Sequence, residues 1–184
     1  MVIIKSIFHL YGLDKYLVIT LKDEENQPIT GEVLVVKILG NSINYITDAN
    51  GQVKIKVPTS GPKTYTARIK YAGSDKFRVS SASAKVTVKK AIPSITAKSA
   101  SYKLQVKAKK YTVSLMNQNK IIKNKKVTIK INGKTYTSKT NSKGQATFTI
   151  KNLKKTGIYN AVITATGNYY YNEVSKNVKI TVNP

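Results

Sequence analysis

Side chains able to move protons or hold metal ions are few in this sequence. His9 is the single histidine, no cysteine occurs, and Glu173 is the only acidic residue after residue 90. General acid–base catalysis near neutral pH usually needs a histidine or a carboxylate whose pKa is shifted by its surroundings. No nucleophile, base and orienting group can be assembled from these positions, so we expect no catalytic activity.

The densest acidic group is Asp23-Glu24-Glu25, in a segment that we expect to connect two strands. Calcium sites need several oxygen ligands, so this group is the natural place to look for one. The simpler interpretation is a solvated turn, and Asp48 with Asn50-Gly51 also fits a β-turn better than a metal loop. No zinc motif, phosphate loop or dinucleotide fingerprint occurs. We therefore expect no metal ion and no cofactor.

Positive charge is the strongest compositional feature. The net charge is +24, and residues 91–184 carry 18 basic residues against one acidic residue. Such a field attracts polyanions. However, all but two of the basic residues, Arg68 and Arg78, are lysines, and lysine lacks the forked geometry that clamps phosphates and bases. Lysines at strand ends also discourage edge-to-edge aggregation. The candidate polyanion contacts are Lys123, Lys125, Lys126, Lys154 and Lys155.

Three consecutive tyrosines, Tyr169, Tyr170 and Tyr171, follow Gly167-Asn168 in an expected loop. Tyr171 aligns with Phe77 of the first half and is expected to pack inward. Exposed aromatic rings on a rigid scaffold can stack on sugars or fill a partner's pocket, so Tyr169 and Tyr170 are candidate partner or glycan contacts. The alternative is that both rings cap the core or a neighbouring domain.

The elements that must position these residues are β-strands. Val, Ile, Thr and Tyr are abundant, and no apolar stripe with a helical period is present. Short alternating segments in the first half predict strands at 2–8, 16–21, 33–38, 43–47, 52–57, 64–71 and 83–88. The second half predicts strands at 94–98, 102–106, 111–116, 126–131, 134–140, 145–150, 158–166 and 176–182.

The second half repeats the first at an offset of about 94 residues. Thr47-Asp48-Ala49-Asn50-Gly51 matches Thr140-Asn141-Ser142-Lys143-Gly144, and Gly73 matches Gly167. Two copies of one fold are therefore expected, as domains 1–90 and 91–184. Pro93 stiffens the short connection between them.

Turn residues indicate the type of sandwich. Asn132-Gly133 predicts a two-residue type I′ hairpin. Gly51 and Gly144 occupy the position of another turn at which glycine is favoured because it adopts positive φ. Tyr65 and Tyr159 each follow a glycine turn at the start of a late strand, where the tyrosine corner of Greek-key sandwiches lies. The predicted fold is all-β, with two tandem immunoglobulin-like Greek-key β-sandwiches.

These motifs, in this order, resemble the Ig-like repeats of adhesin-like surface proteins from methanogenic archaea, which are similar to bacterial Ig-like repeats. The resemblance covers nearly the whole chain. In the first half it depends on Tyr16, Leu21-Lys22-Asp23, Thr47-Asp48, Gly51, Tyr65 and Gly73. In the second half it depends on Tyr111, Leu115, Thr140, Gly144, Tyr159, Gly167 and Tyr171. Asp23 and Asp48 align with Asn117 and Asn141, so no role that needs a carboxylate there applies to both halves.

The resemblance implies a non-catalytic, extracellular cell-surface segment that acts as a stalk or spacer and as a cell or glycan adhesion module. Expected partners are neighbouring Ig-like repeats of a longer chain, and a cell-surface glycan or anionic wall polymer. The alternatives are a basic binding module for nucleic acid or wall polymer, with nucleic acid disfavoured, and a structural protein of a virus or appendage. No apolar run reaches the roughly 18 residues of a membrane span, and we expect any export signal to lie outside this chain.

Overall fold

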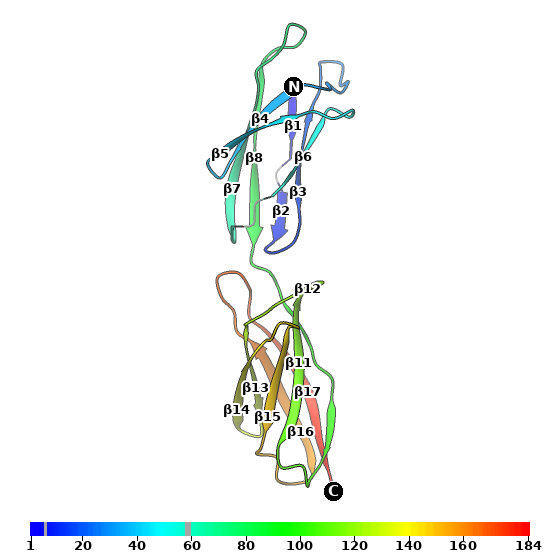
Figure 1. Ribbon diagram of the computed structural model, residues 1–184, viewed down its shortest axis with the longest axis vertical. Coiled ribbons are helices and arrows are strands. Elements are labelled where there is room, and N and C mark those ends of the chain that lie inside the picture. The colour runs from blue at the N-terminus through cyan, green and yellow to red at the C-terminus, as the bar shows by residue number, and fades with distance from the viewer. Residues whose placement is uncertain (6, 58–59) are drawn as a thin grey trace. The chain divides into compact units, whose positions relative to one another are not determined.

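The computed structural model describes residues 1–5, 7–57 and 60–184 (Figure 1). These residues form strands, turns and irregular segments without a helix, which confirms the all-β prediction. Contacts between Cα atoms divide the chain into two compact units, Met1–Lys90 (unit 1) and Ala91–Pro184 (unit 2).

The described part of unit 1 consists of two sheets that enclose one core. The smaller sheet has the order β1-β3-β6. Its strands are β1 (Val2–Ile4), β3 (Tyr16–Leu21) and β6 (Gln52–Lys56). The larger sheet has the order β2-β8-β7-β4-β5. Its strands are β2 (Ile7–Leu10), β4 (Val33–Ile38), β5 (Asn41–Ile46), β7 (Lys63–Tyr71) and β8 (Ser80–Lys89). Alternate residues of β3 and β7 are buried, as expected for strands with one face on the core.

Unit 2 repeats this arrangement. In its smaller sheet β11 pairs with β9, β12 and β15. The bounds are β9 (Ser94–Thr96), β11 (Lys109–Asn117), β12 (Lys120–Ile121) and β15 (Gln145–Ile150). The larger sheet has the order β10-β17-β16-β13-β14. The bounds are β10 (Ala100–Lys103), β13 (Lys126–Ile131), β14 (Lys134–Lys139), β16 (Gly157–Ala165) and β17 (Val174–Asn183). Each unit is thus a two-layer β-sandwich.

The first strand of unit 1 differs from its prediction. The single strand expected at 2–8 is two strands in two sheets: β1 pairs antiparallel with β3, and β2 pairs parallel with β8. Ser6, inside the predicted strand, lies outside the described residues. A strand at the margin of two packed sheets can pair with both edges by bending from one sheet to the other. Strands β9 and β10 of unit 2 make the same two pairings.

The predicted Asn-Gly hairpin is confirmed. Strands β13 and β14 pair up to Ile131 and Lys134, and both turn residues have positive φ, 46° at Asn132 and 73° at Gly133. Unit 1 makes the same turn between β4 and β5 with Leu39 (φ 55°) and Gly40. Strands predicted at 33–38 and 43–47 imply a turn here, but leucine disfavours positive φ, so its residues do not indicate this two-residue type.

Tyr16 and Tyr111, which both belong to the predicted motif, do not occupy equivalent positions in the two units. Tyr111 pairs with Phe148 on the core side of β11, whereas the corresponding pair in unit 1 is Leu17 with Ile55. Tyr16 is 51% exposed and Tyr111 only 4%. Because side chains alternate between faces along a strand, a shift of one residue reverses the face.

Candidate interaction surfaces

The loop at residues 166–173, between β16 and β17, carries the three tyrosines. The side chains of Tyr169 and Tyr170 are 56% and 36% exposed, and their rings meet edge to face with centroids 4.9 Å apart. Tyr171 is partly buried and packs against the core, as predicted. The loop therefore presents two adjacent aromatic rings while the third anchors it.

Hydrogen bonds to the Asn168 side chain and to the backbone of Ala91 stabilise this loop. The Asn168 side-chain oxygen accepts the amides of Tyr170 and Tyr171, at 3.0 and 2.8 Å. The loop is also bonded to Ala91, the first residue of unit 2: the Ala91 amide donates to the Tyr170 carbonyl, and the Asn172 amide donates to the Ala91 carbonyl, both at 2.9 Å. The tyrosine loop thus lies at the end of unit 2 where the chain enters it.

Lys125 lies beside the tyrosine loop and is not part of an exposed basic surface. Only 9% of it is exposed, and its Nζ lies 5.7 Å from the centroid of the Tyr171 ring. Burial lowers the pKa of Lys125 below its ordinary value of 10.5. An ammonium over an aromatic face is attracted by the ring's negative face, which offsets part of the loss of hydration.

The structure does not bring the five candidate polyanion lysines together. Lys123, Lys125 and Lys126 lie before or at the start of β13, whereas Lys154 and Lys155 precede β16. Because β13 and β16 are antiparallel, the two groups lie beyond opposite ends of β16, whose nine residues span roughly 26 Å at about 3.3 Å per residue. The end of unit 2 with the tyrosine loop therefore carries Lys123 and Lys126 as its exposed candidates.

The burial of one lysine was not predicted from the sequence. The run around Lys109 suggests solvated strand-end lysines, yet Lys109 is 1% exposed. Its Nζ donates to the carbonyl oxygens of Val106 and Leu153, at 2.6 and 3.3 Å. The only available signal was its place two residues before Tyr111, on the inward side of β11. Lys109 thus ties two connecting segments to the strand.

Tyr65 and Tyr159 occupy equivalent positions near the starts of β7 and β16. The Tyr65 hydroxyl donates to the Gly61 carbonyl, and the Tyr159 hydroxyl donates to the Lys155 carbonyl, each at 2.9 Å. Each bond reaches back four residues and closes the turn before the strand. A buried phenol needs such a partner, and the bond fixes the approach of the chain to the strand.

Gly51 and Gly144 close equivalent turns with φ of 67° and 73°. A Cβ atom on Gly51 would lie 2.6 Å from the Leu21 carbonyl oxygen, and one on Gly144 would lie 2.9 Å from the Leu115 carbonyl oxygen. Glycine is therefore required both by conformation and by space.

The side-chain oxygens of Asp48 and Asn141 organise these turns. Asp48 Oδ1 accepts the amides of Asn50 and Gln52, both at 2.8 Å. Asn141 Oδ1 accepts the corresponding amides of Lys143 and Gln145, at 2.9 and 3.0 Å. One acceptor oxygen performs this task, so aspartate and asparagine are interchangeable here.

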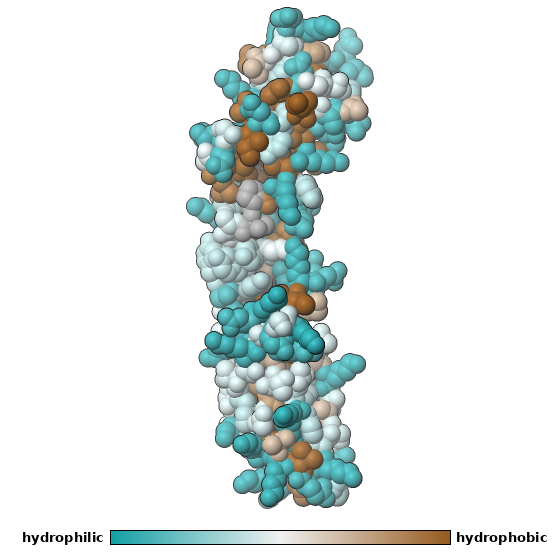
Figure 2. All heavy atoms as spheres, in the orientation of Figure 1, coloured by the Kyte–Doolittle hydropathy of each residue, from teal (hydrophilic) through white to brown (hydrophobic). Residues whose placement is uncertain are grey.

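The surface properties of the two units differ. On the face shown in Figure 2, hydrophobic residues are concentrated on unit 1, and unit 2 displays mainly hydrophilic and neutral residues.

Among residues 1–5, 7–57 and 60–184, no three His, Cys, Asp or Glu side chains are grouped so as to hold a metal ion. None of the described residues forms a helix long and apolar enough to cross a membrane.

No protein-family model matches this chain. No curated protein matches it either. Among solved structures, the chain is similar to invasin, a bacterial integrin-binding protein, with 17% identity and a TM-score of 0.52 over all of this chain and 39% of that chain. It also matches a Ca²⁺-stabilised, ice-binding adhesin of an Antarctic bacterium, with 16% identity and a TM-score of 0.39 over all of this chain and 49% of that chain. A third match is the D0-D1 domain of intimin, with 16% identity and a TM-score of 0.39 over 98% of this chain and 96% of that chain.

The chain thus spans less than half the length of the invasin and ice-binding adhesin structures. At 17% identity, the invasin match shows the fold alone: an all-β chain of immunoglobulin-like sandwiches. Invasin and the ice-binding adhesin are described as bacterial, and none of the three structures is described as archaeal. The methanogen resemblance therefore stays a prediction.

Proposed function

We propose that this chain is a non-catalytic segment of a cell-surface protein, in which tandem Ig-like domains 1–90 and 91–184 serve as a stalk and as an adhesion module. The observation that carries the stalk function is the connection between the units. Strand β8 ends at Lys89, and Ala91 is already fully buried and hydrogen-bonded within unit 2. Lys90 alone separates two anchored residues, which leaves little slack for independent motion.

The extracellular location and the adhesive role draw support from the kinds of protein that the chain resembles. Invasin, which the chain matches with a TM-score of 0.52, is a bacterial integrin-binding protein. The partners that we propose are neighbouring Ig-like repeats of the same polypeptide and a glycan or anionic polymer of a cell surface.

The stalk function is tested by the rotational motion of the full chain. NMR relaxation should give one overall correlation time for both units in the native chain. Inserting about six Gly and Ser residues between Lys90 and Ala91 should lower the correlation times of both units, because such a linker is a flexible coil. Independent tumbling of the units in the native chain would exclude a stalk.

The adhesive surface that we propose contains Tyr169 and Tyr170. Two adjacent exposed rings on a hydrogen-bonded loop can stack on a sugar at little entropic cost. The Tyr169→Ala/Tyr170→Ala variant of this chain should lose binding to cells or glycans, whereas Tyr16→Ala, which removes another half-exposed tyrosine, should not. Equal binding by both variants would mean that the two rings pack within the protein and do not contact a partner.

A basic binding module for anionic polymers is the second candidate, and the charge of residues 91–184 favours it. If charge alone drives binding, affinity should fall steeply with salt. The separation of the lysines allows a matched comparison: Lys123→Gln/Lys126→Gln beside the tyrosine loop, and Lys154→Gln/Lys155→Gln at the other end. Similar losses in both variants favour diffuse attraction, whereas a loss confined to the first favours one site that combines rings and lysines.

A further inference from the structure

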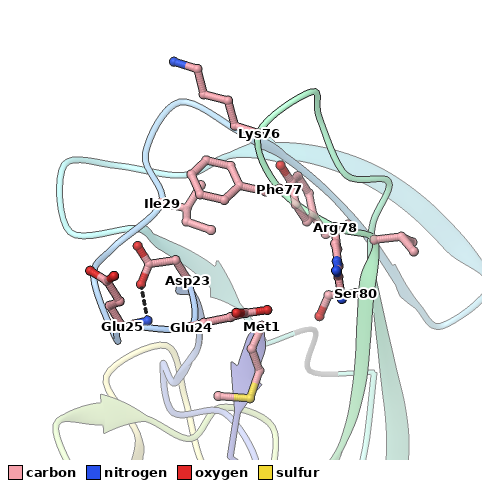
Figure 3. Close-up of a pocket in the computed structure, with 11 residues that line it drawn as sticks. Met1, Asp23, Glu24, Glu25, Ile29, Lys76, Phe77, Arg78 and Ser80 are labelled. Atoms are coloured by element: carbon pink, nitrogen blue, oxygen red, sulfur yellow. Dashed lines mark hydrogen bonds between the residues drawn. The ribbon is translucent and has the colours of Figure 1, made fainter.

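A groove of about 640 Å³ opens at one end of unit 1. Figure 3 shows the acidic residues Asp23, Glu24 and Glu25 on one side of it and the loop with Phe77 and Arg78 on the other. Ile29 and Phe77 supply apolar surface between them. The groove therefore has a negatively charged wall, while Lys76 and Arg78, which also line it, carry positive charge.

The loop that borders this groove, residues 72–79, matches the tyrosine loop of unit 2. Ser74 donates its amide to the Phe77 carbonyl at 2.8 Å, as Asn168 does to the Tyr171 carbonyl at 2.9 Å. A Cβ on Gly73 would lie 3.0 Å from the Val79 amide nitrogen. A Cβ on Gly167 would lie 3.0 Å from the corresponding nitrogen of Glu173. The two loops thus share this hydrogen bond and the close approach of their glycines, with Phe77 at the position of Tyr171, but their backbones differ at the glycine, where only Gly73 has a positive φ, of 84°.

In unit 2 the edge of this loop is occupied by Ala91. The backbone of Ala91 forms a parallel bridge with Tyr171. The Ala91 amide donates to the Tyr170 carbonyl, and the Ala91 carbonyl accepts from the Asn172 amide. Ala91 is fully buried. The equivalent groups in unit 1 are the Lys76 carbonyl and the Arg78 amide. No hydrogen bond reaches either group within the part of the chain that the structure describes. The Lys76 carbonyl and the Arg78 amide of unit 1 can therefore form the same pair of hydrogen bonds that Ala91 makes in unit 2.

The strand register shows which position would fill this edge. Ile95 pairs with Leu115 in unit 2, and Val2 pairs with Leu21 in unit 1, so Val2 corresponds to Ile95. Ala91 lies four residues before Ile95. The equivalent position in unit 1 therefore lies four residues before Val2. In a segment joined ahead of Met1, this is the third residue from the junction.

The charge of the groove matches the kind of segment that enters unit 2. That segment is Lys89-Lys90-Ala91-Ile92-Pro93, with two cations directly before the buried alanine. Asp23-Glu24-Glu25 of unit 1 corresponds to the neutral Asn117-Gln118-Asn119 of unit 2. Only unit 1 thus offers carboxylates to a basic segment, and complementary charge favours both register and partner choice.

We propose that the groove is the receiving site for an extended, basic interdomain segment of the Lys-Lys-Ala-Ile-Pro type, joined ahead of Met1 in the same polypeptide. Its alanine pairs with the backbone of Lys76 and Arg78, and its lysines lie against Asp23–Glu25. This inference rests on the proposed stalk function only in naming a preceding repeat as the source. It identifies the groove as the socket by which one repeat is held by the next.

The test uses the full chain with Lys-Lys-Ala-Ile-Pro added ahead of Met1, compared with the same addition carrying Trp in place of Ala. Amide hydrogen exchange of Arg78 is measured by NMR. The alanine version should slow exchange by ~10-fold or more, because the amide gains a buried hydrogen bond, and the tryptophan version should not, because the site accepts a small residue. Unchanged exchange with both additions would overturn the proposal.

Unit 2 supplies the internal control. The Asn172 amide should be protected in the unmodified chain, and Ala91→Asp should remove that protection, because it buries a charge at the paired position. Glu24→Lys/Glu25→Lys should lower the protection of Arg78 by about threefold at low salt, with little change at high salt. A double variant with undiminished protection would show that the acidic wall does not take part, contrary to the proposal.

The source of the segment is tested separately. A free Lys-Lys-Ala-Ile-Pro peptide should protect Arg78 only at millimolar concentration, because a covalent connection supplies an effective concentration of about that size. Protection by micromolar free peptide would assign the groove to another chain and overturn the same-polypeptide proposal. If Arg78 is protected in a chain whose two units tumble independently, the socket proposal is supported and the stalk function is excluded.

Discussion

The hydroxyl of Tyr65 donates a 2.9 Å hydrogen bond to the carbonyl oxygen of Gly61, four residues earlier in the chain. The ring packs in the core of unit 1 while the hydroxyl closes the turn before β7. Tyr159 makes the equivalent bond to Lys155 in unit 2, from a less buried position.

Tyr65→Phe should lower the free energy of unfolding of unit 1 by about 1–2 kcal/mol, because the buried Gly61 carbonyl loses its partner while the ring stays in place. Tyr159→Phe should lower that of unit 2 by less, since water can reach its site. Urea unfolding followed by residue-resolved NMR separates the two units. An equal loss in both variants would mean that burial does not set the strength of this bond.

Gly51→Ala should destabilise unit 1 by about 2 kcal/mol or more, because the new Cβ meets the Leu21 carbonyl oxygen at a φ of 67°. Gly40→Ala is the matched control: its φ is 84°, yet no atom lies within 4 Å of the new Cβ. That variant should lose only about 1 kcal/mol, from conformation alone. The difference between the two unfolding free energies measures the clash, and no difference would refute it.

Leu39→Asn should stabilise unit 1 by about 0.5–1 kcal/mol, because asparagine tolerates the positive φ of this turn better than leucine. The reverse change, Asn132→Leu, should destabilise unit 2 by more than that amount. Its side chain also donates a 3.1 Å hydrogen bond to the Asn152 carbonyl, which leucine cannot make. Thermal unfolding of both variants checks the prediction, and a destabilised Leu39→Asn chain would contradict it.

Most of the fold was predictable because its signals are local. The Asn132-Gly133 turn and the alternation of β13 and β15 depend on residues close in sequence, and the strand bounds 126–131 and 145–150 agree with the structure. The exposure of Tyr169 and the inward packing of Tyr171 follow from the same kind of reasoning, through the internal repeat.

The features that escaped prediction depend on contacts between distant segments. The burial of Lys109 requires the carbonyls of Val106 and Leu153, and the burial of Lys125 requires the ring of Tyr171. In sequence, each lysine belongs to a run typical of solvated strand ends. The sheet change between β1 and β2 likewise depends on β8, more than 70 residues away along the chain. No local pattern specifies these partners.

His9 should make the stability of unit 1 depend on pH in the mildly acidic range. Burial lowers its pKa below the ordinary value of 6.5; the nearby backbone of Leu10, which makes no hydrogen bond of normal geometry to the ring, offsets this in part, and the charge of Lys15 lowers the pKa further. Between the lowered value and 6.5 the unfolded chain binds more protons than the folded one, so the free energy of unfolding rises with pH. The contribution is complete above pH 6.5 and is lost as the pH falls through the folded-state pKa.

His9→Leu should flatten this dependence in urea titrations of unit 1 between pH 5 and pH 7.5. Neither ring nitrogen has a hydrogen-bond partner among the described residues, so an apolar side chain leaves no partner unsatisfied and should not lower stability at pH 7.5. Because His9 is the chain's only histidine, no other imidazole contributes in this range. A slope that persists in His9→Leu would assign the pH dependence to the carboxylates of unit 1 instead.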